Sequence, residues 1–249
     1  TLSPITDDRG TVTGIVGLAL DITDRREMEE RVRNALDEKT QLLRELYHRT
    51  KNNMQVITSM LTLQAGRSES DEVRAVLAEN TARIRSMALV HEMLYQSNDL
   101  SRINLADYLR RLVDAVAETY HDASGRVQMS VDAADVPVLI DTAVPCGMVV
   151  SELLSNAIKH AFPDGGSGEV SLRLRHEDEV TDGGSIELTV ADTGVGLPDG
   201  LDIHTADSIG MQTIVAIVEH QLQGTVVFDG QGGTRCEVRF SDDQYGERV

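Results

Sequence analysis

Apolar side chains recur every third or fourth residue along a long stretch near the start of the chain. Alternating spacings of four and three keep such residues on one side of an α-helix, as in a coiled-coil seam. Asp24 and Glu27 have the spacing of a capping box, and the polar residues 66–70 break the pattern, so one long helix is expected between them. The seam, with its polar interruptions, consists of Met28, Val32, Ala35, Lys39, Leu42, Leu46, Asn53, Ile57, Met60 and Gln64.

A second stripe follows the interruption and predicts a second helix. Residues 24–98 are therefore expected to form a helical hairpin whose apolar face is too narrow to be covered within one chain. Pairing of two copies into a four-helix bundle would cover it, so a homodimer is expected. His91 falls on the second stripe, which favours a packed histidine over a functional one. The stripe consists of Leu77, Thr81, Ile84, Ala88, His91 and Tyr95.

The rest of the chain mixes helices with strands. The elements interleave without a strict βα repeat, which favours an α/β sandwich over a doubly wound sheet. Because 41% of the chain is hydrophobic and only 3% is aromatic, the core must be built from aliphatic residues and Met. Residues 11–20 alternate after a turn at residues 7–10, as in the second strand of a hairpin. Later helices are expected at 105–120, 146–161 and 209–222, and strands at 127–131, 170–175, 186–191, 225–229 and 235–240.

The charge balance excludes several kinds of partner. Forty-one acidic and 23 basic residues give a net charge of -18, which repels nucleic acid and anionic lipid.

No apolar stretch near the start approaches the roughly 18 residues of a membrane span, so we expect a cytoplasmic segment. Cys146 and Cys236 lack the spacing of a zinc site or a redox pair and are expected to be reduced structural thiols.

The chain starts at Thr1, midway through an expected strand. We therefore expect that it has been cut from a longer protein, which could be tethered to a membrane elsewhere. Residues 1–22 lead into Asp21-Ile22-Thr23-Asp24, which resembles the exit motif after the last strands of a PAS sensor domain. The resemblance implies that the upstream sensor domain is missing from this chain and that the long helix connects it to the later domains.

Four polar residues share one side of the helix expected at 146–161. Glu152, Asn156, Lys159 and His160 stand at positions i, i+4, i+7 and i+8. A carboxylate, an amide oxygen and an ammonium group one turn apart suit a magnesium-bound triphosphate, because Mg²⁺ prefers oxygen ligands and phosphate attracts a positive charge. An ordinary exposed helix face is the alternative.

Asp192 ends a strand whose apolar residues point to the same side. An inward carboxylate needs a donor, and the amine of adenine is a suitable one, while Gly194 and Gly196 allow the backbone to approach a flat ring. The alternative is a turn in which the aspartate bonds its own backbone. Gly210 opens the next helix, whose free amides could receive phosphate, and residues 197–209 between the two glycine-bearing segments have the composition of a lid.

The order of these features is more specific than any one of them. Glu-x-x-x-Asn, Asp-x-Gly-x-Gly, a further glycine and Gly233-Thr234 resemble the boxes of the Bergerat ATP-binding fold, which sensor histidine kinases share with gyrase, Hsp90 and MutL. The resemblance implies that Asn156 holds magnesium, Asp192 reads adenine and Lys159 meets phosphate. The cofactor-binding residues that it implies are Asn156, Lys159, His160, Asp192, Gly194, Gly196, Gly210, Met211 and Thr234.

Residues 45–55 resemble the H-R-x-K-N-N phosphoacceptor box of one subfamily of two-component histidine kinases, and residues 83–96 resemble the second helix of that subfamily. Thr50 takes the place of the usual aliphatic residue. His48 lies about 200° around the helix from the seam residue Leu46, so it is expected to face water. A largely neutral imidazole has a lone pair with which to attack phosphorus. A surface histidine without a task is the alternative.

The residue after the phosphoacceptor is acidic in many histidine kinases, but here it is Arg49. Arg49 and Lys51 are therefore interpreted as stabilising the transferred phosphoryl charge, and either Glu45 or Glu152 as accepting the proton. The sequence does not rank the two carboxylates. The catalytic set is His48, Glu152, Arg49 and Lys51.

These features together predict an α+β chain in two parts, a helical-hairpin dimerisation domain followed by a Bergerat α/β sandwich. The expected activity is autophosphorylation of His48 by ATP with Mg²⁺, followed by transfer to an aspartate of a response-regulator receiver domain. An ATPase or serine kinase with an idle His48 and a nucleotide-binding scaffold are the alternatives. The expected boundaries are a PAS remnant at 1–22, a signalling helix at 23–45, the dimerisation and phosphotransfer domain at 46–100, the ATP-binding domain at 101–243 and a tail at 244–249.

Overall fold

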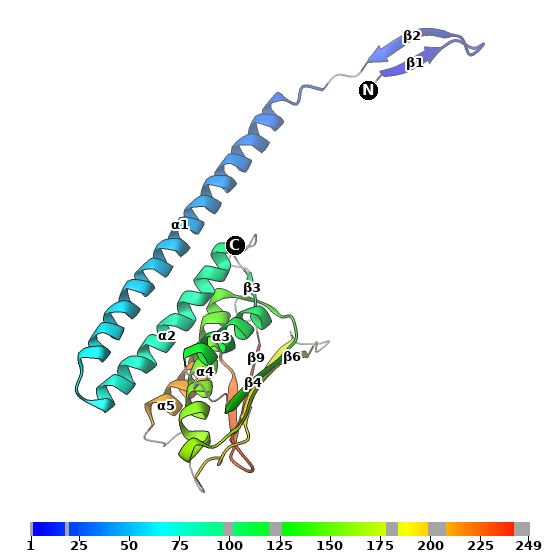
Figure 1. Ribbon diagram of the computed structural model, residues 1–249. Helices are drawn as coiled ribbons and strands as arrows, with labels where there is room; N and C mark the ends of the chain where they lie inside the picture. The colour runs from blue at the N-terminus through cyan, green and yellow to red at the C-terminus, as the bar shows by residue number, and fades with distance from the viewer. Residues whose placement is uncertain are drawn as a thin grey trace. The chain divides into compact units, whose positions relative to one another are not determined.

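A computed structural model describes residues 2–17, 20–96, 102–119, 126–177, 184–198 and 208–241 (Figure 1). The chain divides into two compact units, Thr1–Leu43 and Arg44–Val249. Most of the predicted lid at 197–209 and all of the predicted tail at 244–249 lie outside the described residues.

The first unit begins with an antiparallel hairpin of β1 (Leu2–Thr6) and β2 (Val12–Gly17). Its turn is held by the Asp7 carboxylate, whose Oδ1 accepts the backbone N–H groups of Arg9 and Thr11 at 2.9 Å each. Gly10 supplies the positive φ of +79° that the turn requires. The predicted second strand at 11–20 is confirmed for residues 12–17, whereas Thr11 and Leu20 are not in the strand and residues 18–19 lie outside the described residues.

Helix α1 (Thr23–Arg67) runs from the first unit into the second, where its residues from Arg44 onward pair with α2 (Asp71–Gln96) (Figure 1). The predicted hairpin is therefore confirmed as far as residue 96. Helix α1 begins at Thr23, where the signalling helix was expected to begin, but Asp24 lies in its first turn rather than at the cap that the capping-box spacing implied. Oδ1 of Asp21 accepts the N–H of Thr23 at 2.9 Å, and hydrogen bonds from the Thr23 side chain and backbone lower the pKa of the Asp21 carboxyl.

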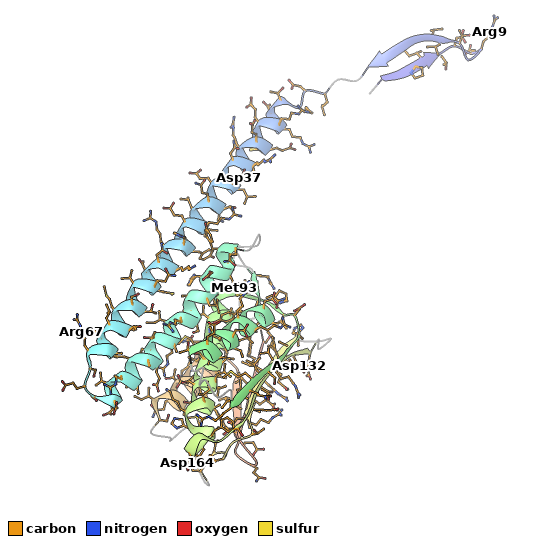
Figure 2. The ribbon with its side chains drawn as sticks, in the orientation of Figure 1. Arg9, Asp37, Arg67, Met93, Asp132 and Asp164 are labelled. Carbon is orange, nitrogen blue, oxygen red and sulfur yellow. The ribbon has the colours of Figure 1, made fainter. Side chains whose placement is uncertain are left out.

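The predicted seam lies on the uncovered side of α1. No described residue of α1 is buried, and Leu46, Ile57 and Met60 remain 57%, 46% and 58% exposed. Side chains project all along α1, as Figure 2 shows. The side of α1 that meets α2 is a different one, on which Tyr47 packs against His91 with ring centroids 5.7 Å apart. Within one chain the seam is therefore not covered and is free to contact another surface. This agrees with the expectation that a single hairpin does not cover its narrow apolar face.

Helix α2 has two occupied sides, whereas the sequence indicated one. Its predicted stripe is only half-buried or exposed apart from Thr81, while Ser86, Val90 and Leu94 are buried on a side that the sequence pattern did not indicate. Val90 and Leu94 join the core of the second unit. A helix placed between two neighbours covers residues on two sides, and the second of these sides was not predicted.

The remainder of the second unit is a two-layer sandwich. Its five-stranded sheet has the order β4-β6-β7-β9-β8, in which only the β4–β6 pair is parallel. Helices α3, α4 and α5 lie on one face of this sheet (Figure 1). The helices are α3 (Leu105–Thr119), α4 (Ile140–Asn156) and α5 (Ile209–Ala216); the strands are β4 (Val127–Ala133), β6 (Gly168–Glu177), β7 (Ser185–Asp192), β8 (Thr225–Asp229) and β9 (Arg235–Ser241).

Short segments complete the sandwich. Helices α4 and α5 each continue into one π-helical turn, η1 (Ala157–Ala161) and η3 (Ile217–Gln221), and η2 (Pro163–Gly165) is a 3-10 turn. Strands β3 (Arg102–Asn104) and β5 (Pro137–Leu139) form a separate antiparallel pair. The pair was not predicted, because three residues are too few to show strand alternation.

The sheet alternates between buried and exposed side chains. Leu174, Leu188 and Val238 occupy one row across three strands and are buried beneath the helices. On the opposite face, Arg239 pairs with Glu187 at 2.9 Å. One covered face and one charged face confirm the predicted α/β sandwich.

Helix α4 begins six residues earlier than predicted, at Ile140 rather than Cys146. Pro145 lies inside the helix, and its usual role as a helix breaker placed the predicted start after it. The predicted end at Ala161 is correct only because the π-turn η1 extends the helix.

Tyr108 joins three helices at the centre of the second unit. It is fully buried on α3, and its hydroxyl donates to the carbonyl of Ser86 on α2 at 3.0 Å. Burial raises the pKa of this phenol far above its usual range, so it stays protonated. Gly147 on α4 lies so close to the ring that a Cβ at this position would collide with the Tyr108 hydroxyl oxygen.

We therefore expect Gly147→Ala to lower the free energy of unfolding by about 1–3 kcal/mol, because an added methyl group overpacks the core. Gly66→Ala is the matched control, since a Cβ there meets nothing within 4 Å at the end of α1. The control should leave stability unchanged or raise it by up to about 1 kcal/mol. Urea denaturation measures both, and equal stabilities would contradict the close packing of Gly147 against Tyr108.

Candidate functional site

A cavity of about 560 Å³ opens between α4, α5 and the sheet. Its floor is a row of side chains across three strands, in which Cys236 pairs with Val190 on one side and Phe228 on the other. Burial, with a smaller contribution from Glu237, raises the pKa of the Cys236 thiol to about 12. Cys236 is therefore a neutral wall of the cavity.

Asn156 and Asp192 line this same cavity from different elements. Oδ1 of Asp192 accepts the N–H of Gly194 at 2.8 Å and the N–H of Thr234 at 3.1 Å. The two interpretations of Asp192 are thus compatible, because one carboxylate oxygen holds the turn while the residue still borders the cavity. Fixing one oxygen in this way orients the carboxylate in advance of any ligand.

Three glycines sit where a side chain would collide with the walls or strain the backbone. A Cβ at Gly194 would collide with the carbonyl oxygen of Ala161, and one at Gly210 would collide with Oε1 of Glu152. Gly196 lines the cavity with a φ of +76°, which a residue with a side chain rarely adopts. Gly210 lets the start of α5 approach α4, Gly194 lets the loop after β7 approach η1, and Gly196 lets that loop approach the backbone of Gly230.

The polar face of α4 is divided between two neighbours. Asn156 and the exposed His160 line the cavity, whereas Glu152 and Lys159 turn to α2. At about 100° per residue, Asn156 lies about 40° around α4 from Glu152. Lys159 and His160 follow on the π-turn η1, where one turns to α2 and the other to the cavity.

Two ion pairs join α2 to α4 and η1. The guanidinium of Arg83 donates to Oε2 of Glu152 from Nη2 at 2.9 Å and from Nε at 3.1 Å. Nζ of Lys159 donates to Oε1 of Glu79 at 2.8 Å. Glu152 is only 5% exposed, so the guanidinium of Arg83 takes the place of water around its carboxylate. Neither Glu152 nor Lys159 lines the cavity in this arrangement, and their predicted roles stay predictions.

The surroundings of His48 lie on α1 and α2. His48 is exposed, as predicted, and its ring packs against Tyr95 with centroids 5.7 Å apart. Nδ1 of His48 lies 3.4 Å from Nδ2 of Asn52, one turn further along α1. The two nearby cations are engaged elsewhere, Arg49 with Glu45 at 2.5 Å and Lys51 with Glu92 at 3.0 Å.

His91 is a packed residue, in agreement with its interpretation from the sequence. Its ring is half-buried against Tyr47, and burial lowers its pKa, so the neutral form is favoured. Its Nδ1 is buried without a hydrogen-bond partner among the residues that the structure describes.

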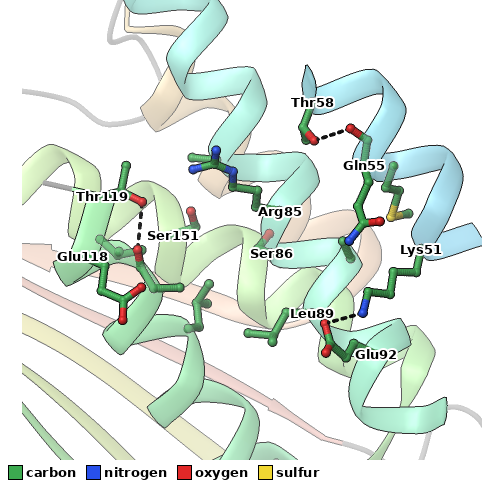
Figure 3. Close-up of a pocket in the computed structure, with 16 residues that line it drawn as sticks. Lys51, Gln55, Thr58, Arg85, Ser86, Leu89, Glu92, Glu118, Thr119 and Ser151 are labelled. Atoms are coloured by element: carbon green, nitrogen blue, oxygen red, sulfur yellow. Dashed lines mark hydrogen bonds and ion pairs between the residues drawn. The ribbon is translucent and has the colours of Figure 1, made fainter. Parts of the chain in front are cut away.

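A second cavity, of about 350 Å³, lies between α1, α2 and α3 (Figure 3). The Lys51–Glu92 ion pair borders it, and Leu89 and Arg85 from α2 also line it. It contains none of the predicted cofactor-binding residues.

Several residues of the first cavity were not predicted. They are mostly apolar, and none was predicted to bind the cofactor. Strand parity pointed to Val190, and Leu197, Pro198 and Ser208 lie in the segment 197–209 that was expected to be a lid. The Arg83 and Glu79 partners of α4 had no signal that spacing alone could reveal. The contact of Asn52 with His48 has the i,i+4 spacing of neighbours on a helix, a signal that was missed. The additional lining residues are Leu153, Ala157, Ala161, Val190, Val195, Leu197, Pro198, Ser208, Phe228 and Cys236.

Neither a metal-binding cluster nor a membrane-spanning helix is found in the described part of the chain. No three His, Cys, Asp or Glu side chains among these residues gather into a possible metal cage. No helix within the same residues combines the length and apolarity needed to cross a bilayer.

The sandwich, its cavity and the helical hairpin define the class of protein. The family model described as histidine kinase matches residues 45–120, and the model described as histidine kinase-, DNA gyrase B-, and HSP90-like ATPase matches residues 142–244. The histidine kinase domain of the Erythrobacter litoralis EL346 blue-light activated histidine kinase matches with a TM-score of 0.59 at 24% identity, over 83% of this chain and 95% of that one. This structural likeness supports the fold.

Curated relatives point to the same family. The sensor histidine kinase PdtaS of Mycobacterium tuberculosis is 36% identical over 214 residues, which are 85% of this chain and 41% of the relative. Blue-light-activated histidine kinase 2 of Erythrobacter litoralis is 31% identical over 185 residues, 71% of this chain and 50% of the relative. The chain thus spans half or less of the length of these relatives. It belongs to the sensor histidine kinases.

The buried ion pair on α4 gives a direct test of the site's architecture. We expect Arg83→Leu to lower the free energy of unfolding by about 3 kcal/mol, because Glu152 would remain buried without a cation. Adding Glu152→Gln should recover much of the loss. Denaturation of the two single variants and the double variant measures the coupling between the residues.

Arg49→Leu is the control, because its pair with Glu45 is exposed and should contribute less than about 0.5 kcal/mol. A loss for Arg83→Leu no larger than that of the control would show that the buried pair does not hold α2 against α4.

Proposed function

We propose that this chain binds ATP with Mg²⁺ in the 560 Å³ cavity and transfers the terminal phosphoryl group to His48. The observation that carries the proposal is the convergence of Asn156 and Asp192 on one cavity, together with an exposed His48 in the phosphoacceptor box. The ATPase-like domain of the family supports ATP as the ligand.

The cavity residues suit the parts of the nucleotide. The carboxylate oxygen of Asp192 that does not hold the turn accepts the amine of adenine, and the row of Val190, Cys236 and Phe228 packs against the flat ring. Gly194, Gly196 and Gly210 keep the walls clear of side chains. His160, Met211 and Thr234 line the remaining surface.

Asn156 is the proposed protein ligand of Mg²⁺. Because Mg²⁺ keeps several waters and binds through substrate phosphates, one amide oxygen suffices on the protein side. The ion would neutralise charge on the phosphate oxygens. Lys159 would add a positive charge after leaving Glu79.

In the transfer step, a lone pair of the His48 imidazole forms a bond to the γ-phosphorus while the bond to the ADP oxygen breaks. Arg49 and Lys51 are proposed to stabilise the charge, and Glu45 or Glu152 to accept a proton. All four form ion pairs in this structure, so each must exchange its partner to act.

The cavity also has to approach His48. None of its lining residues belongs to α1 or α2, and Glu79 and Arg83 tether α4 and η1 to α2. We infer that the ATP-binding part either leaves α2 before transfer or serves the histidine of a second copy. The uncovered seam on α1 supports a homodimer, and a response-regulator aspartate is the proposed final acceptor. The β1–β2 hairpin is the proposed remnant of a PAS domain.

Incubation with γ-labelled ATP tests the transfer. We expect label on the protein that is stable to base and labile to acid, and that disappears in His48→Gln. His220→Gln, which changes a histidine on η3 outside both cavities, should retain the label. Acid-stable label on a partner protein would indicate a serine kinase, phosphate release without label an ATPase, and neither of these a scaffold; each would contradict the proposal.

Binding of a non-hydrolysable ATP analogue tests the role of Asp192. Asp192→Asn keeps an Oδ1 acceptor for Gly194 and Thr234 but can present an amide donor to the adenine amine. We expect the affinity to fall about 10- to 100-fold, as for loss of a charge-assisted hydrogen bond, while the melting temperature changes little.

Asp229→Asn is the matched control for this titration. Its Oδ1 accepts the N–H of Gln231 at 3.0 Å in a similar turn, but it does not line the cavity. Isothermal titration calorimetry with equal affinities for the two variants would contradict adenine recognition by Asp192.

A further inference from the structure

The nitrogen atoms of His48 have different surroundings. Nδ1 lies 3.4 Å from the amide nitrogen of Asn52, which is the hydrogen-bonding partner of the ring among the described residues. Arg49 is turned towards Glu45, and Lys51 towards Glu92. Because Nδ1 is engaged along the helix, Nε2 is the nitrogen open to phosphorus, and it can attack only when it carries no proton.

A neutral imidazole carries one proton, so the contact at Nδ1 determines the state of Nε2. When the Asn52 amide nitrogen donates to Nδ1, as its position here favours, the proton must lie on Nε2, which then has no lone pair. When the amide is rotated by half a turn, Oδ1 accepts a proton carried by Nδ1. Nε2 is then free to react.

We propose that Asn52 is a positioning residue that selects the reactive tautomer of His48 by rotation of its side-chain amide. This inference rests on the proposed function. The rotation needs no backbone change, because the last torsion of asparagine is broad. Asn52 would thus take the orienting role that Arg49 cannot fill, since a guanidinium accepts no hydrogen bond.

The proposed step balances before Glu45, Glu152 or water accepts the proton of the ring. Nε2 forms the bond to phosphorus, the γ-phosphorus–oxygen bond to ADP breaks, and its electron pair stays on ADP. The ring is left as a cation with its proton on Nδ1, which donates to Oδ1 of Asn52. Since His48 is exposed, that proton can later pass to water.

Two substitutions separate orientation from folding. Asn52→Ala removes both amide positions and should lower the rate of His48 phosphorylation about tenfold, equivalent to one hydrogen bond. Asn52→Asp offers only acceptors, so it should hold the proton on Nδ1 and restore the rate. Ser59→Ala is the control, because it deletes another side-chain hydrogen bond on α1, to Gln55, away from His48.

The tautomer is read independently by nitrogen-15 NMR of the chain labelled at histidine, with His48→Gln to assign the signal. Without nucleotide, the wild type should carry the proton mainly on Nε2, Asn52→Asp mainly on Nδ1, and Asn52→Ala a solvated mixture. Ser59→Ala should match the wild type in both tautomer and rate.

An Asn52→Ala variant with the wild-type rate would overturn the proposal. So would equal losses of rate in the Ala and Asp variants with the tautomer unchanged, because that result indicates a structural role. If the tautomer responds as expected but no variant becomes labelled, the hydrogen bond is supported and the proposed function fails.

Discussion

The arrangement of the second unit depends on how α4 shares its surface. One side of this helix is fixed to α2 by the buried Arg83–Glu152 pair, and the next side faces the cavity with Asn156. Gly147, closer to its start, admits the Tyr108 ring, which also bonds α2. A rotation of α4 would break a buried ion pair and a close-packed contact at once, so the direction of Asn156 is set by contacts outside the cavity.

The same sharing links the cavity to the helical hairpin. Gly210 at the start of α5 packs directly against Glu152, whose other oxygen binds Arg83. Lys159 is held by Glu79 of α2 although its neighbour His160 borders the cavity. Movement of the ATP-binding part away from α2 would therefore release Lys159 beside the proposed phosphate site. The same movement would expose the carboxylate of Glu152, which lies next to the start of α5. If the proposed roles of Lys159 and Glu152 hold, contact with α2 and nucleotide chemistry compete for the same residues.

Much of this fold was predictable because its signals are local. Strand parity placed Asp192 beside the buried row ending in Val190, and the interruption at residues 66–70 located the turn between α1 and α2. The predicted start of α4 was wrong because Pro145 is tolerated inside that helix. Strands β3 and β5 were missed because they are too short to show a pattern. For the site, spacing grouped Glu152, Asn156, Lys159 and His160 on one side, but it could not tell which neighbour each would meet. That division depends on the tertiary position of α2, which no pattern within α4 records.

The nucleotide is expected in one cavity, the one that Asn156 and Asp192 border. The most direct measurement is a crystal structure of the chain with Mg²⁺ and a non-hydrolysable ATP analogue. We predict that the adenine amine binds Asp192, that the phosphates and the metal bind at Asn156, and that the adenine ring packs against Cys236. A nucleotide bound instead between α1, α2 and α3, or one that leaves Asn156 and Asp192 without contact, would contradict this prediction.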